Sequence, residues 1–258
     1  MILAIDRGNT QEKIAVFDKN EIVFFDTVCA FDSAYLCKLL SDYKIDCSVY
    51  CSVRNEESNT DFESLFHENK TKIYSAKTLF YFYETKKEKN KTAFDYTFVN
   101  NYKTKDTLGE DRLAAIFGAW AKYNKNILVI DAGTCITFDY LDQNGVYQGG
   151  SINPGFMMKF RALHNFTANL PLLNSIQEVE LCGKTTQECI LSGVVNGTLA
   201  EIDNMIERYC RTNKDLRVLV TGGDAEFLAK HLQKTVDYAP DILFYGLKNI
   251  LEINAKEI

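Results

Sequence analysis

The fold is decided by the first stretch of the chain, Met1-Ile2-Leu3-Ala4-Ile5-Asp6-Arg7-Gly8-Asn9-Thr10-Gln11-Glu12-Lys13. Residues 1–6 form an apolar run that ends at a charge, which is typical of a buried strand. Residues 12–18 and 21–25 contain two further apolar runs. The turn at Gly8-Asn9 therefore connects two strands as a hairpin, rather than a strand to a helix.

The same pattern returns in the second half of the chain. Residues 126–131 read Asn-Ile-Leu-Val-Ile-Asp, and residues 135–141 supply a second strand after the turn Asp131-Ala132-Gly133-Thr134. This repeat indicates an internal duplication. We therefore expect two α/β halves, 1–110 and 111–258, with mixed sheets flanked by helices and a cleft between the halves.

The remaining elements are predicted from hydrophobic periodicity. Helices are predicted over 32–40, 61–67, 109–123, 157–166, 186–209, 225–232 and 243–254, and strands over 47–53, 146–148 and 216–221. Residues 149–155 are predicted as a glycine-rich connection. Residues 77–102 show no clear period and fit either a substrate-covering segment or a surface insertion, and the role of 79–96 stays open.

Composition limits the classes of function. The 258 residues are 46% hydrophobic and 25% charged, so the chain can bury a sizeable core. The net charge of -6 lacks the basic footprint of a nucleic-acid binder, and the basic run 86–91 is interrupted by Glu88. No apolar run approaches the roughly 18 residues of a membrane span, and the first residues lack a signal-peptide pattern. We expect a cytoplasmic protein that binds neither membrane nor nucleic acid.

The eight cysteines do not indicate a metal site. No C-x-x-C pair occurs, and only three histidines are available as further ligands. We expect the cysteines to be mostly small buried hydrophobes. Cys135 lies inside the second turn, where a small residue filling a tight turn is the simpler interpretation than a catalytic thiol.

The first turn has the groups that a phosphate site requires. Gly8 is expected to adopt a positive φ, which exposes backbone N–H groups as an anion-binding nest. Asn9 and Thr10 add side-chain donors, and Lys13 adds a compact positive charge. Asp6 can hold a hydrated Mg²⁺. The alternative is an ordinary Asx-type hairpin turn.

The second turn follows the same logic, since Thr134 can contact a phosphate and Asp131 a cation. Two such turns predict a phosphotransferase that holds ATP between them. Other nucleotide motifs fail: Gly183-Lys184-Thr185 resembles the end of a P-loop, but Glu178 stands where the P-loop requires glycine. No G-x-G-x-x-G motif opens a helix, which argues against dinucleotide cofactors.

Two further motifs carry open alternatives. In Gly109-Glu110-Asp111-Arg112, Asp111 is either a helix cap or the base that accepts a proton from an attacking hydroxyl. Arg112 is either a surface residue or a bidentate ligand for a carboxylate or phosphate. In Thr221-Gly222-Gly223-Asp224, the glycines either face an adenine or ribose or form a short loop that Asp224 caps.

Taken in order, these motifs make the chain resemble the acetate and sugar kinase/heat-shock chaperone/actin superfamily, and within it the type III pantothenate kinases. The resemblance covers residues 5–247. It rests on Asp6-x-Gly8-Asn9-Thr10-x-x-Lys13, Tyr102 before Gly109-x-Asp111-Arg112, Asp131-Ala132-Gly133-Thr134, Gly149-Gly150-x-Ile152-x-Pro154-Gly155, Thr167-Ala168-x-Leu170-Pro171, Thr186 before Ser192-Gly193, and Thr221-Gly222-Gly223.

The resemblance implies two ribonuclease-H-like (actin-like ATPase) domains and ATP-dependent phosphorylation of pantothenate, the first step towards coenzyme A. It implies a homodimer, Mg²⁺ held by Asp6 through water, and K⁺ or NH₄⁺ at Asp131. The implied ATP contacts are Asp6, Arg7, Gly8, Asn9, Thr10, Gln11, Glu12, Lys13 and Thr134. The implied pantothenate contacts are Tyr102, Gly109, Glu110, Asp111, Arg112 and Thr186, with Asp111 as general base.

Three residues depart from the family pattern. Arg7 replaces a small or aliphatic residue, and its charge either touches phosphate or points to solvent. Lys105 replaces a common proline, and Cys135 replaces a usual alanine. Two other functions stay open: a non-catalytic nucleotide-binding relative with a regulatory role, and a kinase of the same superfamily that acts on a sugar or small acid.

Overall fold

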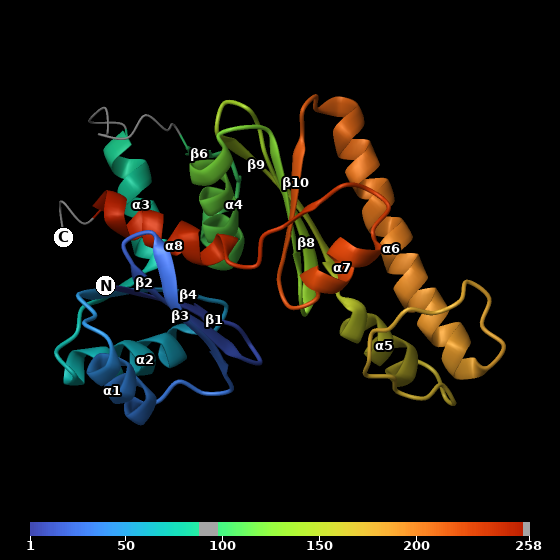
Figure 1. Ribbon diagram of the computed structural model, residues 1–258, viewed down its shortest axis with the longest axis horizontal. Helices are drawn as coiled ribbons and strands as arrows, with labels where there is room; N and C mark the ends of the chain where they lie inside the picture. The colour runs from blue at the N-terminus through green and yellow to red at the C-terminus, as the bar shows by residue number, and fades with distance from the viewer. Residues whose placement is uncertain (88–97, 255–258) are drawn as a thin grey trace. The chain divides into compact units, whose positions relative to one another are not determined.

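The computed structural model describes residues 1–87 and 98–254 and divides the chain into two compact units (Figure 1). The first unit contains Met1–Tyr123 and Ile242–Ile258, and the second contains Asn124–Asp241. The expected halves 1–110 and 111–258 differ from these units by helices α4 (Glu110–Tyr123) and α8 (Ile242–Asn254), which pack against each other in the first unit.

The first unit contains a mixed sheet in the order β3-β2-β1-β4-β5. Its strands are β1 (Ile2–Arg7), β2 (Glu12–Asp18), β3 (Glu21–Val28), β4 (Cys47–Ser52) and β5 (Ile73–Ser75). Its other elements are α1 (Ser33–Asp42), α2 (Glu56–Glu68), α3 (Ala76–Lys87), the short strand β6 (Val99–Asn100), the 3₁₀ turn η1 (Lys105–Thr107), α4 and α8. The predicted hairpin at Gly8-Asn9 is confirmed, because β1 and β2 pair antiparallel.

Helices cover both faces of this sheet (Figure 1). The face towards α1 and α2 buries an apolar cluster that includes Leu3, Ile5 and Ile14 of the hairpin and Phe62 and Phe66 of α2. Each fully buried side chain of this size contributes about 1.5–3 kcal/mol. Helices α3, α4 and α8 pack on the other face, over β1 and β4. The hairpin is thereby fixed from both sides.

The second unit repeats the topology of the first. Its strands are β7 (Ile127–Ala132), β8 (Cys135–Leu141), β9 (Val146–Pro154), β10 (Arg217–Thr221) and β11 (Asp237–Tyr238), in the order β11-β10-β7-β8-β9. Its helices are α5 (Phe156–Asn165), α6 (Thr186–Thr212) and α7 (Ala225–His231). In both units the first strand pairs antiparallel with the second and parallel with the fourth. The predicted duplication is confirmed.

One segment that carried no element prediction contains a helix, and one element prediction is wrong. The stretch 77–102, which showed no period, contains most of α3, while 88–97, including part of the basic run 86–91, lies outside the described residues. The predicted loop 149–155 is largely the second half of β9. There Gly150 lies against β8, since a Cβ on it would come 1.5 Å from the carbonyl oxygen of Phe138.

The expectation for the cysteines is also wrong. Only Cys51 is buried among the eight, all of which are free thiols. The others are partly or fully exposed, because several lie on helix surfaces or in loops rather than in the strands that form the core. No helix within residues 1–87 and 98–254 combines the length and apolar character that a membrane span requires.

Helices α4 and α8 cross at a pair of glycines. A Cβ on Gly118 would lie 2.2 Å from the carbonyl oxygen of Ile242, and a Cβ on Gly246 would lie 1.9 Å from that of Ala114. These neighbours are backbone atoms, which cannot move aside as the end of a flexible side chain can. The crossing therefore requires glycine on both helices.

We predict that Gly246→Ala lowers the free energy of unfolding by about 1–3 kcal/mol or more, since overpacking displaces one helix from the other. Urea denaturation measures the change. The matched control is Gly197→Ala in α6, where nothing lies within 4 Å of the added Cβ. There, alanine should stabilise the helix by up to about 1 kcal/mol. Equal effects of the two substitutions would contradict the close crossing.

Candidate functional site

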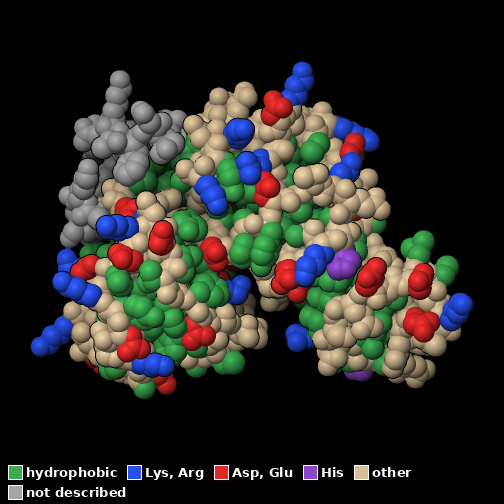
Figure 2. All heavy atoms as spheres, in the orientation of Figure 1, with side chains coloured by type: hydrophobic (Ala, Val, Ile, Leu, Met, Phe, Trp, Pro, Cys, Tyr) green, Lys and Arg blue, Asp and Glu red, His purple; other side chains and the backbone are tan. Residues whose placement is uncertain are grey.

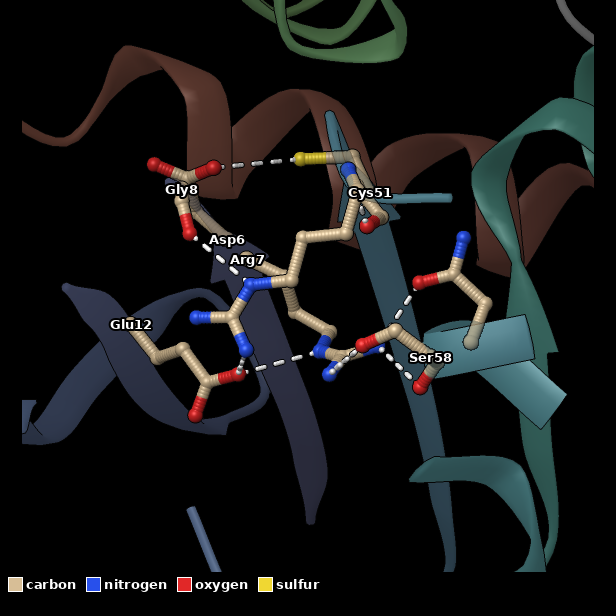
Figure 3. A network of polar contacts seen from close by, with 9 residues as sticks. Asp6, Arg7, Gly8, Glu12, Cys51 and Ser58 are labelled. Atoms are coloured by element: carbon tan, nitrogen blue, oxygen red, sulfur yellow. Dashed lines mark hydrogen bonds and ion pairs between the residues drawn. The ribbon is translucent and has the colours of Figure 1, made fainter. Parts of the chain in front are cut away.

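In the first unit, the candidate site forms where two parallel strands end side by side. Strands β1 and β4 pair in parallel, which places Asp6 opposite Cys51. The thiol of Cys51 donates to Oδ1 of Asp6 at 3.6 Å (Figure 3). Ligands of α/β folds commonly bind at the carboxyl ends of such strands. The hairpin turn extends from the same edge and leaves Asn9 and Thr10 exposed.

The prediction of a positive φ at Gly8 is wrong. Its φ does not lie in the positive region, which the glycines Gly145, Gly149 and Gly222 adopt instead. Glycine is favoured at position 8 by a close approach, because a Cβ there would lie 2.9 Å from the carbonyl oxygen of Gln11. The turn is thus tight across its own backbone.

Arg7 does not point to solvent, because its side chain is buried against Glu12. Its side chain is 4% exposed, and Nε donates to Oε1 of Glu12 at 3.1 Å. Its guanidinium lies 3.8 Å from the ring centroid of Phe62, and Nη1 donates to Oδ1 of Asn59 at 2.7 Å. Burial lowers the pKa of Arg7. Arg7 and Glu12 therefore support the turn from its buried side (Figure 3). Their contact with ATP stays a prediction.

Three carboxylates gather near the strand ends. Burial, and then the charge of Asp111, raises the pKa of Asp6 to about 6, while the charge of Lys13 acts in the opposite direction. Burial also raises the pKa of Glu110 to about 7, opposed by hydrogen bonds from the backbone of Ser52 and Lys77. These shifts indicate that the carboxylates lie close enough to repel one another and that little water surrounds them.

Asp111 is the second residue of α4 and is not its cap. Its Oδ1 accepts the backbone N–H of Arg112 at 2.8 Å. Gly109 makes room for this arrangement, since a Cβ on it would lie 2.4 Å from Oδ1 of Asp111. Arg112 is buried rather than on the surface, and its guanidinium lies 5.9 Å from the ring centroid of Tyr102. The structure therefore brings together Tyr102 and the 109–112 motif. Lys105 pairs with Glu84 at 2.7 Å.

In the second unit, Asp131 is the penultimate residue of β7 and lies next to a loop that requires glycine. Gly222 has φ +96°, and a Cβ there would lie 2.3 Å from Oδ1 of Asp131 and 2.4 Å from the carbonyl oxygen of Ala132. That carbonyl accepts the N–H of Asp224 at 2.9 Å. Carboxylate and carbonyl oxygens are the donors that hard cations prefer, so these residues fit a monovalent cation.

The second turn itself is short and open. The N–H of Gly133 bonds to the carbonyl of Cys135 at 2.9 Å, and Thr134 is exposed. Gly155 lies against it, since a Cβ there would come 2.2 Å from the carbonyl oxygen of Gly133. The predicted substrate contact Thr186 is exposed in the same unit, at the start of α6. Its relation to Asp111, like that between the two turns, stays a prediction.

A groove of about 960 Å³ lies in the second unit, between α6, residues 178–181 and residues 231–234. None of the predicted site residues line it. On the face shown in Figure 2, the Lys and Arg side chains of the described residues are interspersed with Asp and Glu. Neither feature defines a second centre of chemistry.

Comparison with known proteins decides the family. Residues 2–208 match the family of type III pantothenate kinases. The chain belongs to this family. It is 39% identical to the type III pantothenate kinase of Flavobacterium psychrophilum, over 98% of this chain and 99% of that one. It is 37% identical to the type III pantothenate kinase of Flavobacterium johnsoniae, over 92% and 91%.

Solved structures support the fold of this type III pantothenate kinase family member. A candidate Baf family transcriptional activator from Campylobacter jejuni is similar with a TM-score of 0.61 at 21% identity, over 98% of this chain and 99% of that one. A candidate 2-dehydro-3-deoxygalactonokinase from Sinorhizobium meliloti has a TM-score of 0.51 at 9% identity, over 100% and 99%. The chain has an α/β fold of two duplicated ribonuclease-H-like halves with mixed sheets flanked by helices.

Two residues at the first turn were missed in the sequence. Cys51 contacts Asp6, and Arg54 contacts both Gly8 and Glu12. Their contacts depend on the parallel pairing of β4 with β1, which no local motif encodes. The sequence indicated Asp6 at the end of the predicted first strand. It did not single out the residues at the end of the neighbouring strand β4.

The raised pKa of Glu110 predicts a pH-dependent stability. The folded protein holds the proton of Glu110 up to about pH 7, whereas the unfolded chain releases it near 4.5. Its contribution to stability is thus fully present below about pH 4.5 and is lost as pH rises through about 7. Glu110→Gln removes the titrating group. The free energy of unfolding of the variant relative to the wild type should therefore increase between about pH 5 and about pH 8.

Urea denaturation at a series of pH values measures this difference. The matched control is Glu68→Gln, which changes an exposed glutamate at the end of α2. A Glu110→Gln difference that stays flat with pH would show that burial does not shift the pKa of Glu110.

Proposed function

We propose that this chain phosphorylates the terminal hydroxyl of pantothenate with ATP, the first step of coenzyme A biosynthesis. The observation that carries the proposal is membership of the type III pantothenate kinase family over nearly the full chain. The site agrees with it, because Asp6, Lys13 and Asp111 lie in one electrostatic cluster at the strand ends. Phosphoryl transfer requires chiefly positioning, charge neutralisation and one base.

ATP binding is assigned to the two turns. In the first, Asn9, Thr10 and Gln11 are exposed around Gly8, and Lys13 supplies positive charge beside Asp6. In the second, Thr134 is the corresponding donor. Asp6 suits a hydrated Mg²⁺, because a nearby cation would stabilise the ionised form of this carboxyl group, which burial disfavours. When bound, Mg²⁺ neutralises charge on the phosphate oxygens.

Asp111 is proposed as the general base. Its carboxylate is held at the start of α4 by the N–H of Arg112, and the charge of Asp6 lies nearby. In the proposed step, Asp111 accepts the hydroxyl proton of pantothenate as the hydroxyl oxygen attacks the γ-phosphorus and ADP leaves. Tyr102, Gly109, Glu110 and Arg112 would hold pantothenate, and Thr186 stays a pantothenate contact that the family resemblance implies.

The monovalent cation and the homodimer are also proposals. Asp131 and the carbonyl of Ala132 supply oxygen donors for K⁺ or NH₄⁺. The homodimer rests on the family resemblance, and light scattering of the purified protein tests it by mass.

We predict that Asp111→Asn lowers kcat by about 10²–10⁴-fold, the usual contribution of a positioned base. ATP affinity should stay close to that of the wild type, because the assigned ATP contacts are unchanged. ADP release with pantothenate as acceptor measures turnover, and calorimetry with an ATP analogue measures binding. Asp106→Asn, an exposed aspartate in η1, is the matched control. Full activity of Asp111→Asn would refute its role as base.

We predict that wild-type turnover is higher in KCl than in NaCl at equal ionic strength, and that Asp131→Asn abolishes this difference. The reason is that the variant replaces a carboxylate ligand by a neutral amide. Asp215→Asn, an exposed aspartate of the second unit, is the control and should keep the difference. Equal rates of the wild type in the two salts would exclude the cation requirement.

The same assay separates the alternative functions. Sugars tested against pantothenate as acceptors distinguish another kinase of the superfamily. A protein that binds ATP but phosphorylates no acceptor would be the non-catalytic relative.

A further inference from the structure

Arg54 lies between β4 and α2, beside the first turn but outside every motif quoted above. Its side chain is 25% exposed, so it lies at the boundary between the core and solvent. The backbone N–H of Arg54 bonds to Oγ of Ser52 at 3.0 Å, which fixes the chain where it leaves β4. The guanidinium contacts the turn, because its Nε donates to the carbonyl oxygen of Gly8.

The guanidinium connects the turn to the buried network. Its Nε donates to the carbonyl oxygen of Gly8 at 3.0 Å, and Nη1 pairs with Oε1 of Glu12 at 3.0 Å. The same oxygen of Glu12 accepts from Arg7, whose side chain is fixed by Asn59 and Phe62. Glu12 is 1% exposed, so Arg54 is anchored to a group that cannot turn to solvent.

The contact with Gly8 fixes one peptide group of the turn. The chain has no cis peptide among its described residues, and in a planar trans peptide the carbonyl and the N–H point in opposite directions. Holding the Gly8 oxygen at Arg54 therefore directs the N–H of Asn9 away from Arg54 and the network beneath it. This N–H is one of the donors that an anion-binding turn presents.

We propose that Arg54 is a positioning residue for ATP: it fixes the Gly8–Asn9 peptide so that the turn presents its N–H groups to phosphate. The inference rests on the proposed function, because it assigns phosphate to this turn. A charged guanidinium is suited to the task, since charge-assisted hydrogen bonds are about twice as strong as neutral ones. Arg54 acts through the turn and touches no reacting atom.

The experiment measures nucleotide binding and turnover separately in Arg54→Met and Arg54→Lys. Methionine keeps much of the apolar stem and removes both hydrogen bonds, whereas lysine keeps a charge and can restore one contact. We expect the Kd for a non-hydrolysable ATP analogue with Mg²⁺, and the KM for ATP, to rise about tenfold to a hundredfold in Arg54→Met. Arg54→Lys should lie between Arg54→Met and the wild type. The KM for pantothenate should stay unchanged.

Arg211→Met is the matched control, because it removes an arginine that is 72% exposed and pairs within α6. A merely structural role of Arg54 would lower the melting temperature and leave the Kd of the folded protein unchanged, and this result would overturn the proposal. If Arg54→Met does not fold, Arg54→Lys decides: a wild-type Kd in that variant overturns it. If the wild type binds the analogue but does not phosphorylate pantothenate, the proposed function fails while the Kd values still test Arg54.

Discussion

The first unit depends on one buried ion pair, between Arg7 at the end of β1 and Glu12 at the start of β2. The two residues face each other across the hairpin, so their pairing closes the turn that lies between them. Burying two charges costs free energy unless further hydrogen bonds satisfy them. Asn59 and Ser58 supply such bonds to Arg7, and Arg54 supplies one to Oε1 of Glu12, whereas Oε2 of Glu12 is buried without a hydrogen-bond partner among the described residues. These contacts tie the loop after β4 and the first turns of α2 to the hairpin.

The two halves share a topology but present different chemistry at the equivalent place. At the end of β1 the turn is supported by charged side chains, whereas at the end of β7 it is supported by backbone. There Gly155 and Gly222 lie against backbone carbonyl oxygens of the turn that follows Asp131. The equivalent places in the two halves are thus built from different groups, charged side chains in the first and backbone atoms in the second.

Sequence patterns predicted most elements, because strands such as β2 and β8 carry apolar runs bounded by turns and were located to the residue. They failed where tertiary contacts decide. Helix α3 lacks a clear stripe, since it packs against both β4 and α8. The glycines of β9 looked like a loop, but Gly150 is required by the close approach of β8. Asp6 and Asp111 were recognised from motifs, whereas the burial of Arg7 depends on Phe62 and Asn59, far along the chain.

Two of the carboxylates near the strand ends hold their protons to a higher pH than ordinary surface carboxylates do. Asp6 and Glu110 have pKa values raised to about 6 and about 7, so near neutral pH part of the negative charge is held as protons. Lys13 opposes the shift at Asp6. The thiol of Cys51 opposes this shift as well. Burial raises the pKa of the thiol well above its usual range, so it stays protonated and donates to Asp6. The ammonium group of Lys13 and the thiol of Cys51 thus act on Asp6 in the same direction, towards its ionised form.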